Sequence, residues 1–331
     1  MTGSSEDSAR SACCAPSAAD VVQPTQAPPR PPVADSGPGR VEPGAGAGQH
    51  RVEQAVVPAQ AFAMGDALGD GRHADGETPV HEVELEAFSV DVTSVTVADF
   101  ARFVDATGYA TEAEVFGFSA VFHLALAAAP EDVLGRPPQT PWWLGVRGAD
   151  WRHPGGPRSD VDGLADHPVV HVSWNDAQAY CAWAGRALPS EAQWECASRG
   201  GVPGARYPWG DELPQGWVCN IWQGDFPVRN TEEDGFLTTA PVRTYAPNAY
   251  GLWQTVGNVW EWCADWSHAG YYARSPRHDP RGPGSGAERV MRGGSYLCHD
   301  SYCNRYRNAA RSANTPDSSM GNAGFRTVGS A

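Results

Sequence analysis

The sequence contains no lysine: all 24 of its basic residues are arginine. A Schiff base with a carbonyl substrate or pyridoxal phosphate needs a lysine amine, so that chemistry is excluded. The same absence excludes a phosphate-binding loop ending in Gly-Lys-Ser or Gly-Lys-Thr, and a kinase site that pairs a strand lysine with ATP. The 39 acidic residues give a net charge of −15. This charge argues against a nucleic-acid partner, because such proteins present a basic face.

Long hydrophobic runs are also missing. No segment approaches the roughly 20 apolar residues of a membrane-spanning helix. The first residues, MTGSSEDSAR, are polar and lead into no apolar segment, so they do not resemble a secretory signal. We therefore expect no membrane partner and a cytoplasmic location. The eight cysteines would be reduced there, and are expected to be free, metal-binding or catalytic.

Large apolar side chains are scarce in residues 1–55, which are rich in Ala, Pro, Gly and Ser. Such a segment buries too little surface to offset the entropy lost on ordering, so we predict a disordered tail. Cys13 and Cys14 fall within it, and we expect no role for them. Residues 56–331 are predicted to form a single catalytic domain.

Regular patterns are few within this domain. Residues 80–88 alternate between polar and apolar and predict a strand. Three segments have a cap residue or a helical apolar spacing and predict helices: Val97 to about Thr107, Ser173 or Asn175 to Gly185, and Ser190, with Gln193 completing a capping box, to Gly200. Elsewhere, 37 Gly and 28 Pro indicate loops. The expected fold class is an irregular α+β domain, packed around many of its 13 Trp.

His167 and His171 have the spacing of a helical zinc pair. However, Pro168 follows the first histidine, and the nearby valines favour a strand. On a strand, residues four apart are separated by about 13 Å, so they cannot share a metal. We predict that both histidines are structural.

Two acidic segments are candidates for cation binding. The loop NIWQGDFPVRNTEEDGF (220–236) offers hard oxygen ligands, which suit calcium. Its spacing is not that of an EF-hand, and a solvated acidic loop explains these residues better. In GNVWEW (257–262), Glu261 lies between two Trp. A buried carboxylate is costly, so Glu261 requires either a cation or hydrogen-bond donors.

Cys298 and Cys303 lie in the Arg-rich segment 292–326. Nearby Arg and His favour the thiolate form, and two thiolates suit a soft cation such as Cu(I). A structural zinc site needs four ligands, and only His299 is an obvious third. On these residues alone, a functional dithiol site, a local disulfide and two inert thiols all remain open.

The segment GGSYLCHDSYCNRYRNAARSANTPDSS (293–319) closely resembles the signature of the formylglycine-generating enzymes. The resemblance covers about Val56 to Thr327, through further blocks at 61–66, 75–85, 167–195, 220–227, 230–236 and 257–266. It implies a variant of the C-type-lectin fold with little regular secondary structure.

The resemblance also implies an activity. A cysteine in a Cys-x-Pro-x-Arg motif of an unfolded or nascent sulfatase polypeptide would be oxidised to Cα-formylglycine by molecular oxygen, with a thiol reductant. Cys298 and Cys303 would hold Cu(I), and the substrate thiolate would be the third ligand. Four other residues match positions near the oxygen pocket or the substrate groove: Ser295, Ser119, Asn322 and His299.

Structural Ca²⁺ is implied at two sites. The first would use Asn220, the Ile221 carbonyl, Asp234 and the Phe236 carbonyl. The second would use Gln254, Gly257, Val259 and Glu261, although the family usually has Asn at the position of Gln254. The two disulfides of secretory relatives are predicted to be absent, because the position facing Cys181 is Thr327 and the second pair falls on Ser198 and Asn308.

Three alternatives compete with this interpretation. A non-catalytic binding or scaffold module on the same fold would not need the Cys298/Cys303 pair. An iron-dependent sulfoxide synthase would need a histidine cluster on an added helical bundle, for which the chain has no room. A thiol–disulfide oxidoreductase would have C-x-x-C opening a helix, whereas the spacing here is C-x4-C.

Overall fold

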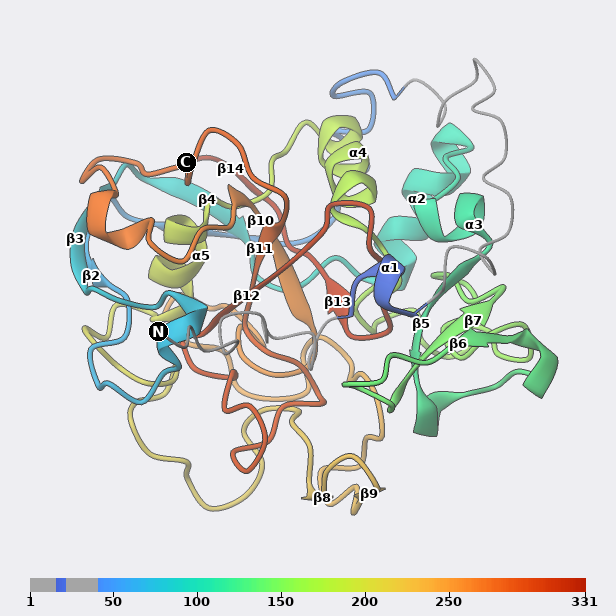
Figure 1. The fold of residues 1–331 in the computed structure, drawn as a ribbon. Coiled ribbons are helices and arrows are strands. Elements are labelled where there is room, and N and C mark those ends of the chain that lie inside the picture. The colour runs from blue at the N-terminus through green and yellow to red at the C-terminus, as the bar shows by residue number, and fades with distance from the viewer. Residues whose placement is uncertain (1–15, 22–40) are drawn as a thin grey trace, which may run out of the picture.

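The computed structural model describes residues 16–21 and 41–331. The α-helices found there are α1 (Ala18–Val21), α2 (Val97–Thr107), α3 (Glu112–Phe116), α4 (Trp174–Ala184) and α5 (Glu191–Ser198). The strands are β1 (Gln54–Val57), β2 (Gln60–Met64), β3 (His81–Leu85), β4 (Phe88–Asp91), β5 (Phe118–Phe122), β6 (Val133–Gly135), β7 (Trp143–Arg147), β8 (Gly224–Asp225), β9 (Arg229–Asn230), β10 (Trp260–Trp266), β11 (Arg289–Arg292), β12 (Arg311–Asn314), β13 (Ala323–Gly324) and β14 (Val328–Ser330). The predicted irregular α+β class is confirmed, since long loops connect these short elements (Figure 1).

The strands of the described residues form small sheets. The central sheet has the order β12-β11-β10-β13, in which only β13 runs parallel to its neighbour. A second sheet, β1-β4-β14, places the last strand beside an early one. A third, β5-β7-β6, stands to one side of the molecule (Figure 1). Two-stranded pairs, β2-β3 and β8-β9, complete the arrangement.

Local capping signals explain where the helices begin. Four of them start with a capping box, in which two side chains each satisfy a backbone N–H: Thr96 with Asp99, Thr111 with Glu114, Ser173 with Asp176, and Ser190 with Gln193. The three predicted helices are therefore confirmed. None of the helices in the described ranges is both long and apolar enough to cross a lipid bilayer.

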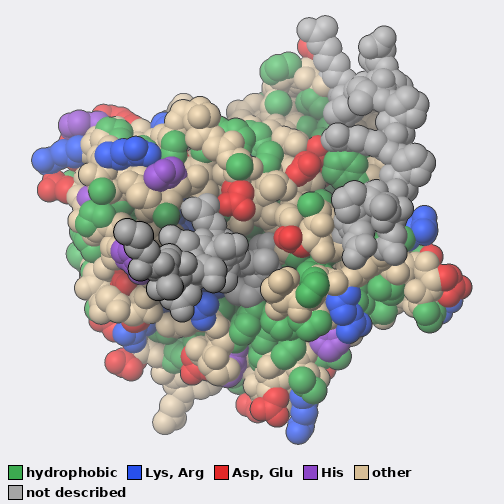
Figure 2. All heavy atoms as spheres, in the orientation of Figure 1, with side chains coloured by type: hydrophobic (Ala, Val, Ile, Leu, Met, Phe, Trp, Pro, Cys, Tyr) green, Lys and Arg blue, Asp and Glu red, His purple; other side chains and the backbone are tan. Residues whose placement is uncertain are grey.

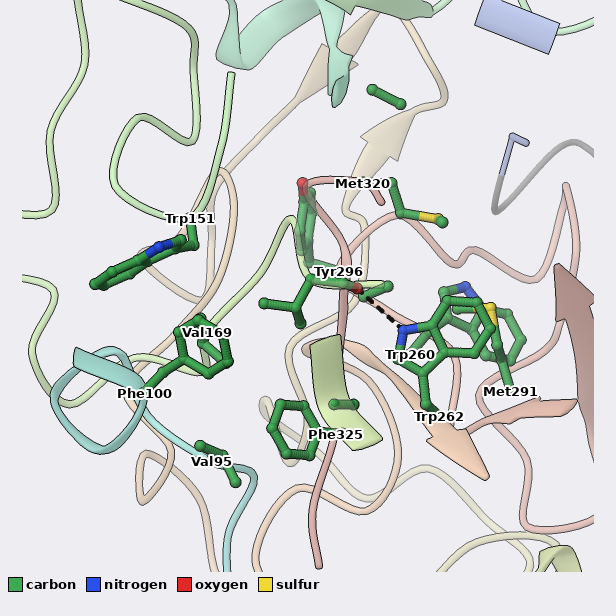
Figure 3. Packing of buried hydrophobic residues seen from close by; sticks show 14 of the residues in the cluster. Val95, Phe100, Trp151, Val169, Trp260, Trp262, Met291, Tyr296, Met320 and Phe325 are labelled. Atoms are coloured by element: carbon green, nitrogen blue, oxygen red, sulfur yellow. Dashed lines mark hydrogen bonds between the residues drawn. The ribbon is translucent and has the colours of Figure 1, made fainter. Parts of the chain in front are cut away.

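The main hydrophobic core lies between α2, α4 and the central sheet (Figure 3). Phe100 of α2 stacks on Tyr180 of α4, with ring centroids 6.1 Å apart, and Phe325 meets the same tyrosine at 5.3 Å. Five tryptophans are less than 2% exposed: Trp143, Trp183, Trp222, Trp260 and Trp262. The many tryptophans are thus largely core residues, because each buries a large rigid surface.

The arginines of the C-terminal segment have a structural role that the sequence did not indicate. Arg292 is completely buried and contacts Glu195 at 2.5 Å and Glu191 at 3.0 Å. Four more of these arginines pair with carboxylates: Arg305 with Asp75, Arg307 with Glu77, Arg311 with Glu191 and Arg326 with Glu261. The Arg-rich composition near the cysteines therefore reflects, in these five cases, buried ion pairs.

Packed structure begins earlier than Val56. The backbone N–H groups of Gly44 and Gly46 donate to the carbonyls of Ala182 and Trp183, at 2.7 and 2.8 Å, and so cover the end of α4. Residues 41–55 therefore belong to the domain, and residues 16–21 also pack against it. Composition could not reveal this, because the contacts depend on distant partners, among them Tyr180 and Asp91, which bind the ring of His50. The rest of the predicted tail, 1–15 and 22–40, lies outside the described residues, and Cys13 and Cys14 lie there too.

Candidate active site

Cys298 and Cys303 lie on one loop between β11 and β12. Two glycines turn the chain out of β11: at Gly293 (φ +95°) and Gly294 (φ +72°), an added Cβ would approach a backbone oxygen to 2.7 Å. The Cys303 N–H donates to the His299 carbonyl at 2.9 Å and closes the loop. Both cysteines are buried, with 0% and 2% exposure. The fold thus holds two thiols on a short loop inside the protein.

Ser295 connects this loop to the C-terminal segment. Asn322 donates from Nδ2 to Ser295 Oγ at 3.0 Å, and both residues are fully buried. The Ser295 N–H points at the sulfur of Cys298, 3.4 Å away. A donor directed at sulfur favours the thiolate over the thiol. The structure therefore brings together three of the predicted site residues, which come from two separate segments.

His299 lies on the outer side of the loop. Its Nδ1 is 2.7 Å from Ser301 Oγ and 3.1 Å from the Asp300 carboxylate. The side chain is 26% exposed. Neighbouring residues of its own loop thus hold the ring, which remains partly open to solvent, as contact with a peptide would require.

Ser119, on β5, belongs to a buried chain of hydrogen bonds. Its Oγ is 2.8 Å from Ser319 Oγ and 2.7 Å from His171 Nδ1, and His171 Nε2 is 2.8 Å from the Pro154 carbonyl. A carbonyl can only accept, so Nε2 carries the imidazole proton and Nδ1 accepts from Ser119. Burial lowers the pKa of His171 to about 4, which keeps the ring neutral. The hydroxyl of Ser119 is therefore fixed as a donor to His171.

The two histidines of the H-x3-H pair have separate partners. The strand expected around them does not form, because His171 adopts a left-handed conformation with φ 58°. His167 Nδ1 instead lies 2.9 Å from Thr239 Oγ1. Each ring thus has a hydrogen-bonding role of its own.

A wall of aromatic rings stands beside the dithiol loop. Phe226 stacks on Tyr302, with centroids 4.2 Å apart, and Trp142 meets these rings at 5.3 and 5.4 Å. All three are partly exposed. The backbone N–H of Trp222 donates to the Cys298 carbonyl at 3.0 Å, and the Trp222 ring meets Phe226 at 5.3 Å, so this residue connects the wall to the loop. Hydrophobic side chains gather in the lower centre of the face in Figure 2. Sequence reasoning missed this wall because its members come from three distant segments.

A cavity of about 250 Å³ adjoins the loop at Tyr296. Its walls are mainly apolar and include Val121, Phe122, Val161, Leu164 and Val170. Polar side chains also line it, among them His167 and Trp151, and Trp151 Nε1 is buried without a hydrogen-bond partner. Tyr296 forms part of the cavity wall and donates to the Gly321 carbonyl at 3.1 Å. No sequence motif indicates this cavity.

The first candidate calcium site centres on Asn220. Its amide nitrogen donates to the Thr238 carbonyl at 2.8 Å, which fixes the orientation of the amide. Asn220 Oδ1 is then buried without a hydrogen-bond partner. A buried oxygen that lacks a donor is the kind of atom that a calcium ion coordinates. The predicted ligand Asp234 is half-buried and accepts from the Tyr245 hydroxyl at 3.2 Å.

Gln223 draws the other predicted ligands of this site together. Its side-chain nitrogen donates to the Ile221 carbonyl at 2.5 Å, and its oxygen accepts from the Asp234 N–H at 3.2 Å. The Phe236 N–H in turn donates to Asp234 Oδ1 at 3.1 Å. The loop thus folds back on itself, and the residues present fit a calcium ion.

The second candidate site would combine side-chain and main-chain oxygens as ligands of a cation. Gln254 Nε2 donates to the Pro241 carbonyl at 2.6 Å, and its Oε1 is buried without a partner. The turn at Gly257 (φ +75°) packs closely against the first site, since an added Cβ would lie 2.5 Å from the Asn220 carbonyl. Val259, next along, is buried. An amide oxygen and main-chain carbonyls are therefore the groups at hand for a cation.

Glu261 is already surrounded by donors. Arg326 reaches its two oxygens at 2.7 and 2.8 Å, Trp194 Nε1 donates at 2.7 Å and the Ser94 hydroxyl at 2.8 Å. The prediction that this carboxylate requires donors or a cation is confirmed, with donors as the solution. Among the described residues, no three His, Cys, Asp or Glu side chains are grouped to hold a metal. A metal here would thus take ligands from amide and carbonyl oxygens or from a substrate.

Four further cysteines are buried free thiols: Cys181, Cys196, Cys219 and Cys263. Burial raises the pKa of Cys196 and of Cys219 to about 12, so these thiols stay protonated and inert. Cys181 is a free thiol, and at the position of its expected partner Thr327 donates from its hydroxyl to Asp91. At the second position, Ser198 Oγ donates to Asn308 Oδ1 at 2.8 Å.

The family of the sulfatase-modifying factor enzyme 1-like domain matches residues 43–331. The chain is 65% identical to a formylglycine-generating enzyme of Streptomyces coelicolor, over 84% of its own length and 89% of that relative. It is 44% identical to a Bos taurus protein named inactive C-alpha-formylglycine-generating enzyme 2, over 85% and 89% of the two chains. The chain therefore belongs to the sulfatase-modifying factor enzyme family, as segment 293–319 predicts.

A solved structure shares the fold. PvdO from Pseudomonas aeruginosa matches with a TM-score of 0.62 at 22% identity, over 88% of this chain and 98% of that one. At this identity the match concerns the fold alone. It agrees with the predicted fold class of little regular secondary structure.

Proposed function

We propose that the protein oxidises a cysteine of a sulfatase-type polypeptide to Cα-formylglycine, in keeping with its Streptomyces relative, which is named a formylglycine-generating enzyme. The observation that carries this proposal is the buried connection of Cys298, Ser295 and Asn322 by hydrogen bonds. These groups lie beside partly exposed aromatic rings that an extended peptide can contact.

Cys298 and Cys303 would hold Cu(I), which soft sulfur ligands suit, with the substrate thiolate as the third ligand. When bound, copper supplies the one-electron chemistry that lets molecular oxygen react. The residues of the chain orient the reacting groups. The Ser295 N–H favours the thiolate of Cys298, and Asn322 fixes the direction of the Ser295 hydroxyl. At the Asn220 site, Ca²⁺ would be a structural ligand.

The proposed reaction consumes one oxygen molecule and two reductant thiols for each cysteine. The substrate Cβ loses its bond to sulfur and one hydrogen, and gains a carbonyl oxygen. Both atoms of the oxygen molecule leave as water, one water molecule supplies the carbonyl oxygen, sulfur leaves as hydrogen sulfide, and the reductant becomes a disulfide. A reducing cytoplasm would supply such thiols, and the free thiols of Cys181 and Cys196 support that location.

The substrate would have to present its motif in an extended form, because both cysteines of the site are buried. An unfolded or nascent polypeptide meets this condition. The proline of a Cys-x-Pro-x-Arg motif helps, because it restricts the preceding residue to extended conformations.

The test is incubation of the copper-loaded chain with a Cys-x-Pro-x-Arg peptide, oxygen and a thiol. We expect an aldehyde that hydrazines trap and mass spectrometry detects, and none from the matching Ser peptide. Cys298→Ser and Cys303→Ser should each lose stoichiometric copper and turnover. Cys219→Ser, which changes a buried thiol outside the loop, should keep both. Undiminished copper in both loop variants, or equal conversion of the Ser peptide, would overturn the proposal.

One observation favours an alternative, a non-catalytic peptide-binding module: the Bos taurus relative named inactive is 44% identical. The same assay separates the two functions. A module would bind the Cys-x-Pro-x-Arg peptide and release it without any aldehyde.

A further inference from the structure

A short segment of the predicted tail is docked on the domain. Pro16 and Val21 are buried, whereas Ala19 and Asp20 between them are exposed. Asp20 accepts from the backbone N–H and the hydroxyl of Ser17 and so closes the first turn of α1. Val21, 1% exposed, belongs to the main hydrophobic core. The segment therefore has one face buried against the domain and one face open to solvent.

The protein holds this segment by its backbone. Asn314 Nδ2 donates to the Pro16 carbonyl at 3.0 Å, and the Ala18 N–H donates to Ser318 Oγ at 2.9 Å. Bonds from side chains to a main chain recognise a peptide without requiring a particular sequence. Helix α1 contacts β5 and β7, and Figure 1 shows it beside β5.

The docking surface continues into the candidate active site. Ser319, next to Ser318, is hydrogen-bonded to Ser119 on β5. The same stretch of chain reaches Asn322, which donates to Ser295. The surface thus shares β5 and residues 314–322 with the positions that the family resemblance assigns to the substrate groove.

The sequence around this segment partly matches the spacing of the proposed substrate motif. Residues 14–18 read Cys-Ala-Pro-Ser-Ala, which contains the Cys and the Pro of Cys-x-Pro-x-Arg but has Ala18 at the position of the Arg. The docked Pro16 is therefore the proline of this pattern. Cys14 itself lies outside the described residues. Without the Arg, such a segment resembles the substrate but lacks the one charged group of the motif.

We propose that Pro16–Val21 is an internal pseudosubstrate, which occupies the peptide-binding surface formed by β5, Asn314 and Ser318 and which a substrate must displace. This inference rests on the proposed function. A tethered segment competes at an effective concentration of roughly millimolar, so weak contacts are sufficient. The apparent affinity of a free substrate falls by the fraction of molecules in which the surface is open.

The first test measures binding without turnover. A fluorescent Cys-x-Pro-x-Arg peptide is titrated into the copper-loaded full chain under nitrogen. Val21→Asp places an unpaired charge at a buried position and should release the segment. Ala19→Asp adds the same charge at an exposed position of α1 and is the matched control. If the segment is docked in about nine molecules of ten, Val21→Asp tightens peptide binding about tenfold.

Ala19→Asp should bind the peptide as the parent does, and melting curves confirm that both variants are folded. Equal affinity in parent, Val21→Asp and Ala19→Asp would overturn the inference while leaving the proposed function intact. Binding by none of them would count against the proposed substrate, and against this inference with it.

The second test completes the motif inside the chain. Ala18→Arg gives Cys14 the full Cys-x-Pro-x-Arg context, and we expect its conversion to the aldehyde with oxygen and thiol, by the balance given above. The rate should not depend on protein concentration, since the substrate is tethered. Ala19→Arg, with the same charge one residue later, should leave Cys14 intact. If Ala18→Arg also left Cys14 intact while the free peptide was converted, the segment would not occupy the substrate surface.

Discussion

His171 Nδ1 lies 2.7 Å from the Ser119 hydroxyl, and burial lowers the pKa of the imidazole to about 4. Between pH 4 and the ordinary value of 6.5, the unfolded chain binds a proton at this histidine and the native chain does not. The native state therefore loses stability as pH falls through this window, by roughly 3 kcal/mol in all.

The variant His171→Gln cannot titrate, so its free energy of unfolding should depend less on pH between 4 and 6.5 than that of the parent. Urea denaturation at several pH values measures the slope. Parallel curves for the parent and His171→Gln would show that this histidine is not the neutral group described.

Asp265 should act in the opposite direction. Burial, with the nearby Glu191 carboxylate, raises its pKa to about 7. The native carboxyl holds a proton that the unfolded chain releases near pH 3.8, so its contribution to stability is lost as pH rises through 7. Asp265→Asn can still accept from the Glu191 N–H and carries no charge. We expect its advantage over the parent to be larger at pH 8 than at pH 5, by about 2 to 3 kcal/mol.

The contrast between pH 8 and pH 5 is the decisive measurement for Asp265. The exposed change Asp225→Asn should have no effect at either pH. A gain for Asp265→Asn that is equal at both values would assign its effect to packing and not to charge.

Calcium binding at the Asn220 site should appear as thermal stability. A ligand at about 100 times its Kd stabilises the native state by about 2.7 kcal/mol. The parent should therefore melt at a higher temperature with Ca²⁺ than with a chelator. Asp234→Ala should melt below the calcium-loaded parent, and at the same temperature with Ca²⁺ as with the chelator. Asp225→Ala, an exposed carboxylate of the same loop, should respond as the parent does. Identical melting of the parent with and without Ca²⁺ would mean that the loop is only a solvated acidic surface.

Replacing Arg292 should lower the free energy of unfolding more than most other single substitutions in the domain. Arg292 contacts Glu195 and Glu191, and all three side chains are at most 3% exposed. Glu191 and Glu195 would keep Arg311 and Arg199, but the buried acceptors that Arg292 serves, including the Asn308 carbonyl, would lose a donor. Leaving buried acceptors unsatisfied costs about 1 to 3 kcal/mol each, or about 3 to 5 kcal/mol in all. Arg292→Met should lower the free energy of unfolding by about that amount. Arg277→Met, which removes surface pairs with Glu82 and Glu84, should cost less than about 1 kcal/mol.

Local signals account for what the sequence predicted well. Helices α2, α4 and α5 begin at capping boxes, within a few residues of the predicted starts. Strand β3 lies within the segment whose alternating pattern predicted a strand. The association of Cys298 with Ser295 was also predictable, since both residues lie in one signature. Each of these features needs only neighbours along the chain.

Features that depend on distant segments were not predictable. The bond between Ser119 and His171 requires a left-handed residue at a valine-rich position where a strand is expected. The aromatic wall and the cavity combine side chains from several loops. Packing of residues 16–21 and 41–55 was missed because their partners, such as Asn314 for Pro16 and Asp91 for His50, lie far away in the sequence and composition does not record them.

The pairing of β14 with β4 means that this sheet is completed only when the end of the chain has been synthesised. Val90 at the beginning of the domain lies opposite Val328, and Asp91 accepts from the N–H of Thr327. While the chain is being synthesised, β4 exists long before its partner, so its outer edge stays open for almost the whole of translation. An open edge invites pairing with other chains. A nascent copy of this protein would therefore need either delay or protection, whereas a released copy closes the edge within its own sequence.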